Sequence, residues 1–385
     1  MKKIIIHQFL RTGKLTAIIA ILSSALWSCR KDSKVTPDNA TEITDPLSAS
    51  KKSFYLLNEG NMDMNKASLD FFDHQTGIYK HNIFEEINPD VTRGLGDVGN
   101  DMQVYGAKLY IVVNNSNKIE VLNVHTGKRI AKIDLTNGRY ITFYKGKAYV
   151  SSYQSRVGDS NSANGYVARI DTATLEIEQT VMVGRQPEEM AIVGEKLYVA
   201  NSGGYDPQQY ENTVSVVDLN TFREIKKIEV AINLDRVKAD QYGDIYVTSR
   251  GDSYTISSNL FVIDSSTDEV RKKFDLGASN LCIDGDRAYV VSVEYSYTSL
   301  KNVVSYALID VKNETVINRS FITDGTDKEI SRPYGIAVDP VTKDIYVTDA
   351  KDYVTPGVLY CFDSSGRKKW SVTTGDIPAH FAFIN

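Results

Sequence analysis

Histidine is scarce in this chain, which has five in 385 residues. The four outside the N-terminal leader, His74, His81, His125 and His380, stand in segments that we expect to lie far apart. A metal site built from several histidines is therefore excluded, and a Ser–His–acid triad would have His380 as its one candidate base. We interpret His380 as a hydrogen-bonding residue, and we predict neither a metal site nor a catalytic constellation.

Clusters of basic residues are also missing, and so are stretches with a convincing helical period. The formal net charge is −5, and the 28-residue leader holds four basic residues and no acid, so the rest of the chain is near −9. Nucleic-acid binding is excluded because neutralising phosphates needs concentrated Lys and Arg. The apolar runs are short, rich in Val, Ile and Tyr, and bounded by Gly, Asp, Asn and Lys, which is typical of strands.

Cysteine occurs three times. Cys282 and Cys361 fall inside predicted strands of different repeats, where they form either one disulfide or two free, buried thiols, and we favour the thiols. Cys29 follows an apolar core of 13 residues, Leu15–Trp27, that suits a secretion signal. The phrase LWSC resembles a bacterial lipobox; the alternative is an ordinary signal with an incidental Cys29. We expect a signal peptide over 1–28, lipid on Cys29 and a flexible tether over 29–52.

One phrase recurs along the rest of the chain: a polar residue, a hydrophobic residue, Tyr and another hydrophobic residue. The pentapeptide DIYVT occurs twice, at Asp244 and Asp344. Seven tyrosines anchor the phrase at spacings of 39 to 57 residues: Tyr55, Tyr110, Tyr149, Tyr198, Tyr246, Tyr289 and Tyr346. A recurrence in this range indicates a repeat architecture.

A second phrase alternates with the first. Each is a short apolar run that ends in Asp or Asn, whose side chain can close a tight turn by accepting backbone N–H groups. The turn residues are Asp73, Asn123, Asp171, Asp218, Asp264, Asp310 and Asp363. Each unit can be divided into four strands, so we predict an all-β fold: a seven-bladed β-propeller of four-stranded antiparallel blades over 53–385.

The two ends of the repeat predict how the ring closes. The first Tyr phrase, at Ser53, has no inner strand before it, and the last unit is followed by the extra segment Ile377–Asn385. We therefore predict that Ala379–Ile384 pairs with Phe54–Leu57 and completes the first blade, which leaves no open sheet edge at the seam.

Strand alternation places the long loops on one face of the propeller. This long-loop face carries the connections between second and third strands and the links between blades, including 58–67, 152–165, 201–212 and 293–302. It is rich in Tyr and Arg, which suit binding through flat apolar surfaces and planar hydrogen-bond donors. The residues that we predict to bind a ligand are Arg93, Arg139, Tyr153, Arg185, Tyr205, Tyr254, Tyr295, Tyr334 and His380.

Phrases such as KLYVANSG, TVSVVDLNT and VGRQPEEMAI resemble the YVTN repeat of YncE-like propellers. The order of lipobox, tether, propeller and opening NEGN phrase is similar to surface lipoproteins of gut-type Gram-negative bacteria, among them the BtuG-type proteins. This resemblance implies a lipid-anchored protein at the outer-membrane surface that binds cobalamin or another corrinoid and sits over an outer-membrane transporter.

The residues alone leave three functions open. The first is a monomeric, non-catalytic binder of a small polar ligand, which we favour; the second is a propeller enzyme of the lyase or lactonase type; the third is an interaction scaffold of the cell envelope. We expect no cofactor other than the ligand itself, and contact with the membrane only through the lipid.

Overall fold

The computed structural model describes residues 40–43, 53–157, 159, 163–204, 206–252, 254–296 and 300–384. Cys29, the predicted signal peptide and most of the predicted tether lie outside these residues. Within them, no helix is both long enough and apolar enough to cross a membrane.

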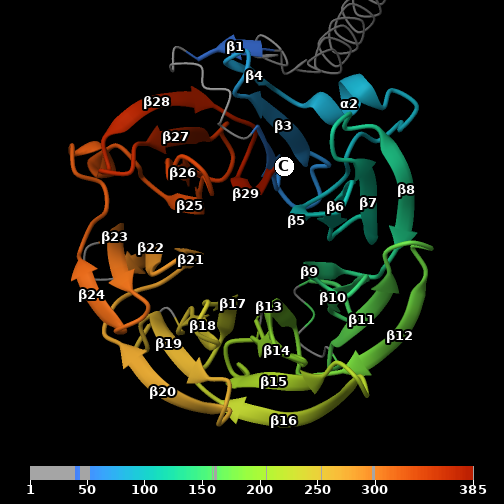
Figure 1. Cartoon of the computed structure of the whole chain (residues 1–385), viewed down its shortest axis with the longest axis vertical. Helices are drawn as coiled ribbons and strands as arrows, with labels where there is room; N and C mark the ends of the chain where they lie inside the picture. Colours follow the sequence, from blue (N-terminus) through green and yellow to red (C-terminus); the bar gives the residue numbers. More distant parts are fainter. Residues whose placement is uncertain are drawn as a thin grey trace, which may run out of the picture. The chain divides into compact units, whose positions relative to one another are not determined.

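The described residues form seven antiparallel sheets arranged around a common centre (Figure 1). The predicted seven-bladed all-β propeller is confirmed. Counted from the inner strand outwards, the first blade is β29 (Pro378–Phe383), β2 (Phe54–Asn58), β3 (Ser68–Asp73), β4 (Ile78–Lys80) and β1 (Ala40–Glu42). The second is β5 (Gly99–Tyr105), β6 (Lys108–Val113), β7 (Lys118–Asn123) and β8 (Arg129–Asp134). The third is β9 (Gly138–Tyr144), β10 (Lys147–Ser152), β11 (Tyr166–Asp171) and β12 (Ile177–Met182).

The remaining four blades follow the same plan. The fourth is β13 (Pro187–Val193), β14 (Lys196–Asn201), β15 (Thr213–Asp218) and β16 (Arg223–Glu229), and the fifth is β17 (Leu234–Ala239), β18 (Asp244–Ser249), β19 (Asn259–Asp264) and β20 (Glu269–Phe274). The sixth is β21 (Asn280–Asp284), β22 (Arg287–Ser296), β23 (Lys301–Asp310) and β24 (Thr315–Asn318), and the seventh is β25 (Pro333–Val338), β26 (Ile345–Asp349), β27 (Val358–Phe362) and β28 (Lys368–Thr373). Two short helices, α2 (Ile83–Ile87) and η1 (Thr326–Lys328), lie in the links.

Ring closure occurs as predicted. Strand β29 pairs antiparallel with β2, with Phe54 opposite Phe383 and Leu57 opposite His380. The C-terminal strand thereby becomes the inner strand of the blade that the N-terminal part of the domain supplies.

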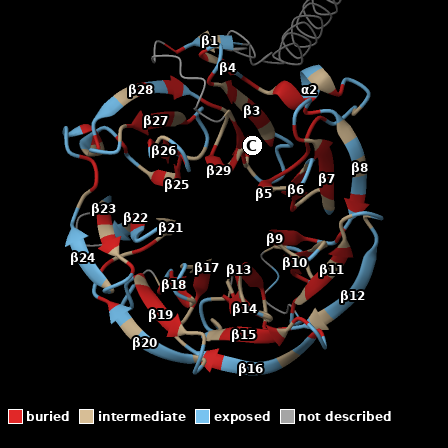
Figure 2. Ribbon diagram, viewed as in Figure 1, coloured by how far each residue is buried: buried red, intermediate tan, exposed pale blue. Residues whose placement is uncertain are grey.

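The apolar core is divided among the seven interfaces between neighbouring blades, each of which holds one cluster of buried side chains. The middle strands are mostly buried, whereas most residues of the outermost strands β12, β16, β20 and β24 are exposed (Figure 2).

The repeated tyrosines join one blade to the next. The Tyr55 hydroxyl donates to the carbonyl of Val124 over 2.8 Å, and the Tyr246 hydroxyl to the carbonyl of Val311 over 3.2 Å. Tyr198 donates to the carboxylate of Asp268 over 2.6 Å. Each acceptor lies in the Asx turn between the third and fourth strands of the following blade. The two recurring phrases of the sequence are therefore the two halves of one contact between blades.

Blade 1 has a fifth strand that the sequence did not predict. Three residues within the segment expected to be a flexible tether, Ala40–Glu42, form β1 and pair antiparallel with β4. The next residue, Ile43, is buried in the apolar cluster that includes Phe54, Phe72 and Trp370. Strand β4 has only three residues, so the added pairing covers an edge that would otherwise be exposed.

The expectation of a loop over 293–302 is wrong, because strands β22 and β23 extend through most of that segment. Their register continues from Val293 opposite Val304 to Ser296 opposite Lys301. The alternation of Val293 and Tyr295 with polar neighbours is typical of paired strands, and cross-strand pairing extends the hairpin beyond the length of the other blades.

Candidate ligand-binding site

Six of the seven inner strands contain a β-bulge near their first residue. In β17, for example, Leu234 pairs with Ser249 and Val237 with Val247, so that Asp235 and Arg236 together face one residue, Thr248. A bulge redirects side chains and is common beside functional sites. Here the bulged pairs supply much of the central lining, including Arg139 and Tyr140 in β9 and Asp235 and Arg236 in β17.

The Thr of the recurring YVT phrase stabilises these bulges. The Thr248 hydroxyl accepts the backbone N–H of Arg236 over 2.9 Å, and the Thr348 hydroxyl accepts that of Gly335 over 2.7 Å. In blade 3 the hydroxyl of Ser151 accepts the N–H of Tyr140 over 3.1 Å. The bulge takes one backbone N–H out of the hydrogen-bond pattern between the strands, and the Thr or Ser hydroxyl accepts that N–H instead.

Thr248→Val should lower the free energy of unfolding by about 1–3 kcal/mol, because the buried N–H of Arg236 would lose its acceptor while the side-chain volume is nearly unchanged. Chemical denaturation measures the change. Thr180→Val, on the exposed face of β12, is the control and should leave stability within about 0.5 kcal/mol of the parent. Equal stability of all three proteins would contradict the assigned role.

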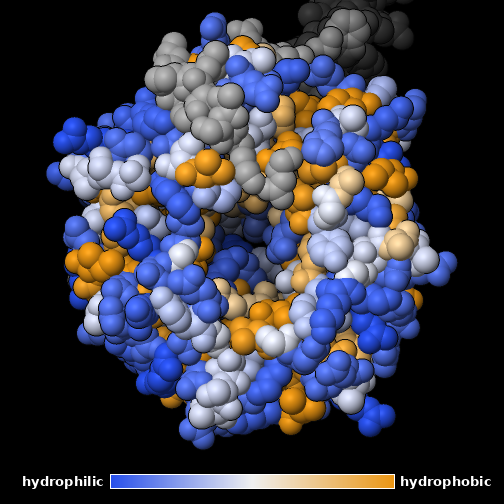
Figure 3. Space-filling view, viewed as in Figure 1, coloured by the Kyte–Doolittle hydropathy of each residue, from blue (hydrophilic) through white to orange (hydrophobic). Residues whose placement is uncertain are grey.

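A cavity of about 760 Å³ opens at the centre of the long-loop face. The space-filling view shows the hollow in the middle of the ring (Figure 3). Its lining comes from blades 1, 2, 3, 5, 6 and 7, and includes Glu59, Asn100, Arg139, Tyr140, Asp235, Arg236, Arg250, Tyr254, Asn280, Tyr295, Tyr334 and Tyr353.

A buried carboxylate, Glu188, organises one wall of the cavity. It is 1% exposed and accepts hydrogen bonds from Tyr153 Oη over 2.6 Å and from Arg139 Nε over 3.1 Å. Arg250 Nη1 reaches the same carboxylate over 3.3 Å, and Ser202 Oγ donates to it over 3.3 Å. Burial alone would raise the pKa of Glu188, but the guanidinium groups of Arg139 and Arg250 lower it to about 2.

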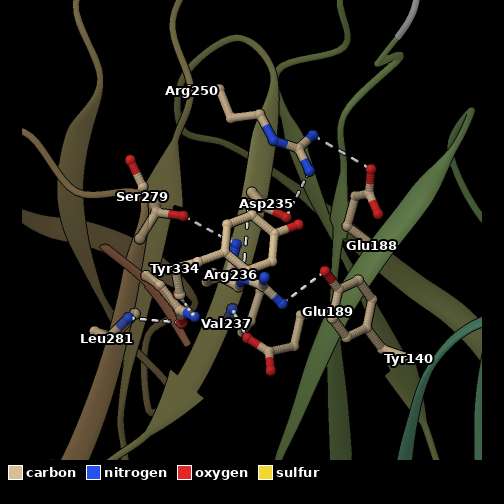
Figure 4. Close-up of polar contacts among 12 residues, drawn as sticks. Tyr140, Glu188, Glu189, Asp235, Arg236, Val237, Arg250, Ser279, Leu281 and Tyr334 are labelled. Carbon is tan, nitrogen blue, oxygen red and sulfur yellow. Dashed lines mark hydrogen bonds and ion pairs between the residues drawn. The ribbon is translucent and has the colours of Figure 1, made fainter. Parts of the chain in front are cut away.

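Asp235 and Arg236 of blade 5 continue this wall (Figure 4). Arg250 also donates to Asp235 over 2.8 Å, so its guanidinium bridges two carboxylates. Arg236, buried beside Asp235, donates from Nη1 to the hydroxyl of Tyr140 over 2.6 Å. Burial raises the pKa of Tyr140 well above its ordinary value, so the phenol stays protonated and can itself donate into the cavity.

The opposite wall is formed across the closure seam. The Tyr334 hydroxyl donates to Glu59 over 3.0 Å, and His380 Nε2 lies 3.3 Å from the other oxygen of Glu59. His380 Nδ1 lies 3.6 Å from the buried carboxylate of Asp101, whose pKa burial raises. His380 therefore lies between carboxylates from blades 1 and 2.

The structure brings some of the predicted residues together and separates others. Arg139, Tyr254, Tyr295 and Tyr334 line the cavity. Tyr153 lies buried beneath the wall, under the guanidinium of Arg139, whose Cζ is 4.9 Å from the ring centroid. His380 does not line the cavity, but its Nε2 lies 3.3 Å from the lining residue Glu59.

Two more of the predicted residues, Arg93 and Arg185, are also absent from the cavity lining. Arg93 is exposed in the link between blades 1 and 2, and its carbonyl accepts the side-chain amide of Asn65 over 2.9 Å. Arg185 pairs with Glu211 over 3.5 Å and donates to the carbonyl of Gln209. Tyr205 lies outside the described residues.

Sequence reasoning missed Glu59, Tyr140, Asp235 and the buried Glu188. The signal that could have found Tyr140 and Asp235 is their place directly before the hydrophobic part of an inner strand. Glu188 and Glu189 occupy the same place in the quoted phrase VGRQPEEMAI. The two described cysteines, Cys282 and Cys361, form no disulfide with each other, and Cys361 is buried whereas Cys282 is partly exposed. Among the described residues, no group of three or more His, Cys, Asp or Glu side chains could hold a metal ion.

Fold and cavity together define the class of this protein: a seven-bladed β-propeller with a polar, aromatic-lined cavity at the centre of its long-loop face. Within that class, residues 52–383 match the family model described as "Domain of unknown function (DUF5074)", and the chain belongs to this family. A comparison with curated proteins finds no match.

Two solved structures are similar to the propeller. One is the hydrazine synthase of Kuenenia stuttgartiensis, with 16% identity and a TM-score of 0.55 over 69% of this chain and 76% of that one. The other is a quinonprotein alcohol dehydrogenase-like protein from Bacteroides thetaiotaomicron, with 14% identity and a TM-score of 0.55 over 87% of this chain and 79% of that one. At these identities the similarity shows the fold alone.

Proposed function

We propose that this protein is a cell-surface lipoprotein that captures a small polar ligand in the central cavity, without catalysing a reaction. The observation that carries the proposal is the cavity itself. Its volume of about 760 Å³ lies within the range of small-molecule sites, and its lining combines tyrosine rings with guanidinium and amide donors.

The ion pairs of the wall support binding rather than catalysis. Glu188 and Asp235 are held by arginines, and the arginines are held in turn by these carboxylates and by Tyr140. Side chains fixed in this way lose little conformational freedom when a ligand binds, which favours affinity. They form a rigid surface of donors and acceptors.

The ligand that we propose is a corrinoid such as cobalamin, which the protein would pass to an outer-membrane transporter. The identity of this ligand comes from the resemblance to BtuG-type lipoproteins, and the lining of the cavity is compatible with a corrinoid. A corrin is broad and rimmed with amides, so it would cover the mouth. Tyrosine rings could pack on its surface, and Arg250, Asn100 and Asn280 could bond its amides and phosphate.

The same proposal includes the anchor. The LWSC phrase would make Cys29 the lipidated N-terminus of the mature chain, with the propeller held away from the membrane by the following residues. Stable attachment requires more than one acyl chain, which bacterial lipoproteins carry.

Titration calorimetry with cyanocobalamin tests the ligand. Tyr254, on the cavity rim and 75% exposed, offers a variant that should leave the fold intact, and Tyr254→Ala should weaken binding about tenfold. The matched control is Tyr242→Ala, a tyrosine exposed in the β17–β18 hairpin on the other face, which should bind like the parent.

Absence of both heat and a melting shift with cyanocobalamin well above micromolar concentration would remove the corrinoid from the proposal. A thermal-shift series with haem, glycans and siderophores would then test the remaining claim, because a tight ligand raises the melting temperature by mass action.

A further inference from the structure

The sixth blade has an open edge. Its outer strand β24 has four residues and pairs only with the end of β23, from Leu308 to Asp310. Strand β23 itself has ten residues. Along Lys301–Ala307, no strand among the described residues pairs with the outer edge of β23. Such an edge presents backbone N–H and C=O groups that can pair with another strand.

A groove runs beside this edge. It has a volume of about 620 Å³, with one side formed by β23 and the other by the link between blades 6 and 7. The lining is Asn302, Val304, Ser305, Tyr306, Arg319, Ser320, Asp327, Lys328, Ile330 and Ser331. It lies outside the central cavity, with which it shares no lining residue.

The groove has a basic charge. Arg319 and Lys328 are exposed on its wall, and neither forms an ion pair with a described residue. Lys301, at the start of the open edge, is exposed as well, whereas Asp327 is the one acidic residue of the lining. The unpaired cations favour a partner that carries negative charge.

A buried hydroxyl in the groove lacks a partner. Tyr306 is 7% exposed, and its Oη makes no hydrogen bond. The ring is fixed by an edge contact with Phe321, with centroids 5.6 Å apart. The hydroxyl oxygen is itself enclosed by the protein, so Tyr306 is a fixed part of the groove wall and the hydroxyl is not presented to a partner.

Blade 1 shows how this molecule completes a short outer edge. There β4 has three residues, and the segment Ala40–Glu42 pairs with it as the added strand β1. Blade 6 has the same short outer strand without an added segment among the described residues (Figure 1).

We propose that the groove of blade 6 binds an extended, acidic peptide segment of a partner protein, which pairs with Lys301–Ala307 as an added strand. Main-chain hydrogen bonds to β23 provide the affinity of such a complex, and Arg319 and Lys328 select acidic side chains. The site is separate from the proposed ligand cavity, so either proposal can fail alone.

The test uses a blocked peptide of alternating Glu and Val, long enough to run beside Lys301–Ala307, with fluorescence anisotropy as the readout. We expect saturable binding, and protection of the amides of Lys301–Ala307 in hydrogen exchange. The same peptide N-methylated at alternate residues should bind at least about tenfold more weakly, because methylation removes the donors of one strand edge.

Charge reversal gives the matched protein variants. The double variant R319E/K328E should lose about tenfold or more in affinity for the Glu/Val peptide and gain affinity for a Lys/Val peptide. The control K128E/R223E changes the same charge at exposed residues remote from the groove, and it should bind like the parent.

Several results would overturn the proposal. One is that the Glu/Val peptide does not bind at millimolar concentration, and another is that the N-methylated peptide binds as tightly as the unmethylated one. The proposal also fails if R319E/K328E and K128E/R223E lose the same affinity, or if the protected amides lie outside Lys301–Ala307. Dimerisation through this edge, seen as a doubled mass in light scattering that R319E/K328E abolishes, would assign the groove to a second copy and also overturn it.

Discussion

Removing Ile377–Asn385 should abolish the cooperative unfolding transition of the propeller. The deletion takes away β29, which is the inner strand of blade 1 and pairs the C-terminal end of the chain with β2. Ala379 and Ala382 are buried, and the rings of Phe381 and Phe383 both pack on Phe54, with centroids 5.7 Å apart in each pair. The loss exceeds what a domain stable by about 5–15 kcal/mol can tolerate.

The contacts of β29 extend beyond its own blade. Thr348 of blade 7 donates to the carbonyl of Pro378 over 2.6 Å, and His380 approaches Asp101 of blade 2. Without the strand, blade 7 and blade 2 each lose a neighbour, and the inner edge of β2 becomes open to aggregation. We therefore expect poor solubility along with the lost transition.

A second truncation supplies the control. A protein that begins at Ser53 lacks β1, which is also a terminal strand of blade 1 but covers only its outer edge. It should melt within a few degrees of the parent, since Ile43 is the one described core residue that the truncation removes. Melting is followed by circular dichroism, and a C-terminal truncation that melts like the parent would disprove the assigned closure.

The sequence predicted the repeat of the blades because each blade is encoded by patterns among residues that are close together along the chain. Each Tyr phrase is an alternating strand and each Asx phrase a tight turn, and both patterns involve neighbours along the chain. The spacing of Tyr55, Tyr110 and the other anchors then determines the number of blades. What the pattern could not show is the acceptor of each hydroxyl, since Tyr55 and Val124 are 69 residues apart.

The residues that line the cavity were harder to predict than the repeat, for a physical reason. Strand alternation assigns each residue to one face of its sheet, but a bulge breaks the alternation. Asp235 and Arg236 are adjacent in sequence, yet both line the cavity. Arg185 was selected because it lies in a blade link on the correct face, and its pairing with Glu211 holds it outside the cavity lining.

Replacing Glu188 by Ala should lower the free energy of unfolding by about 3–5 kcal/mol, because Arg139 would lose its buried counter-charge and Arg250 one of its two carboxylates. Arg139 has a side chain only 9% exposed, so water cannot readily replace the carboxylate. Urea denaturation measures the loss. Glu229→Ala, an exposed carboxylate in β16, is the control and should change stability by about 0.5 kcal/mol or less.

The same carboxylate predicts a dependence of stability on pH. Arg139 and Arg250 lower the pKa of Glu188 to about 2 in the folded protein, against an ordinary value near 4.5 when unfolded. The unfolded chain therefore binds the proton more tightly, so the contribution of Glu188 is complete above about pH 5 and is lost as the pH falls towards 2. A shift of this size corresponds to about 3 kcal/mol.

Glu188→Gln isolates this contribution from that of the other carboxylates. The neutral amide cannot titrate, so the stability difference between parent and variant should shrink steadily from pH 5 to pH 2.5, with the parent more stable at the upper end. Urea midpoints measured at half-unit intervals of pH give the curve. A difference that stays constant over this range would show that Glu188 titrates alike in the folded and unfolded chains, and that the paired wall of the cavity does not hold its charge.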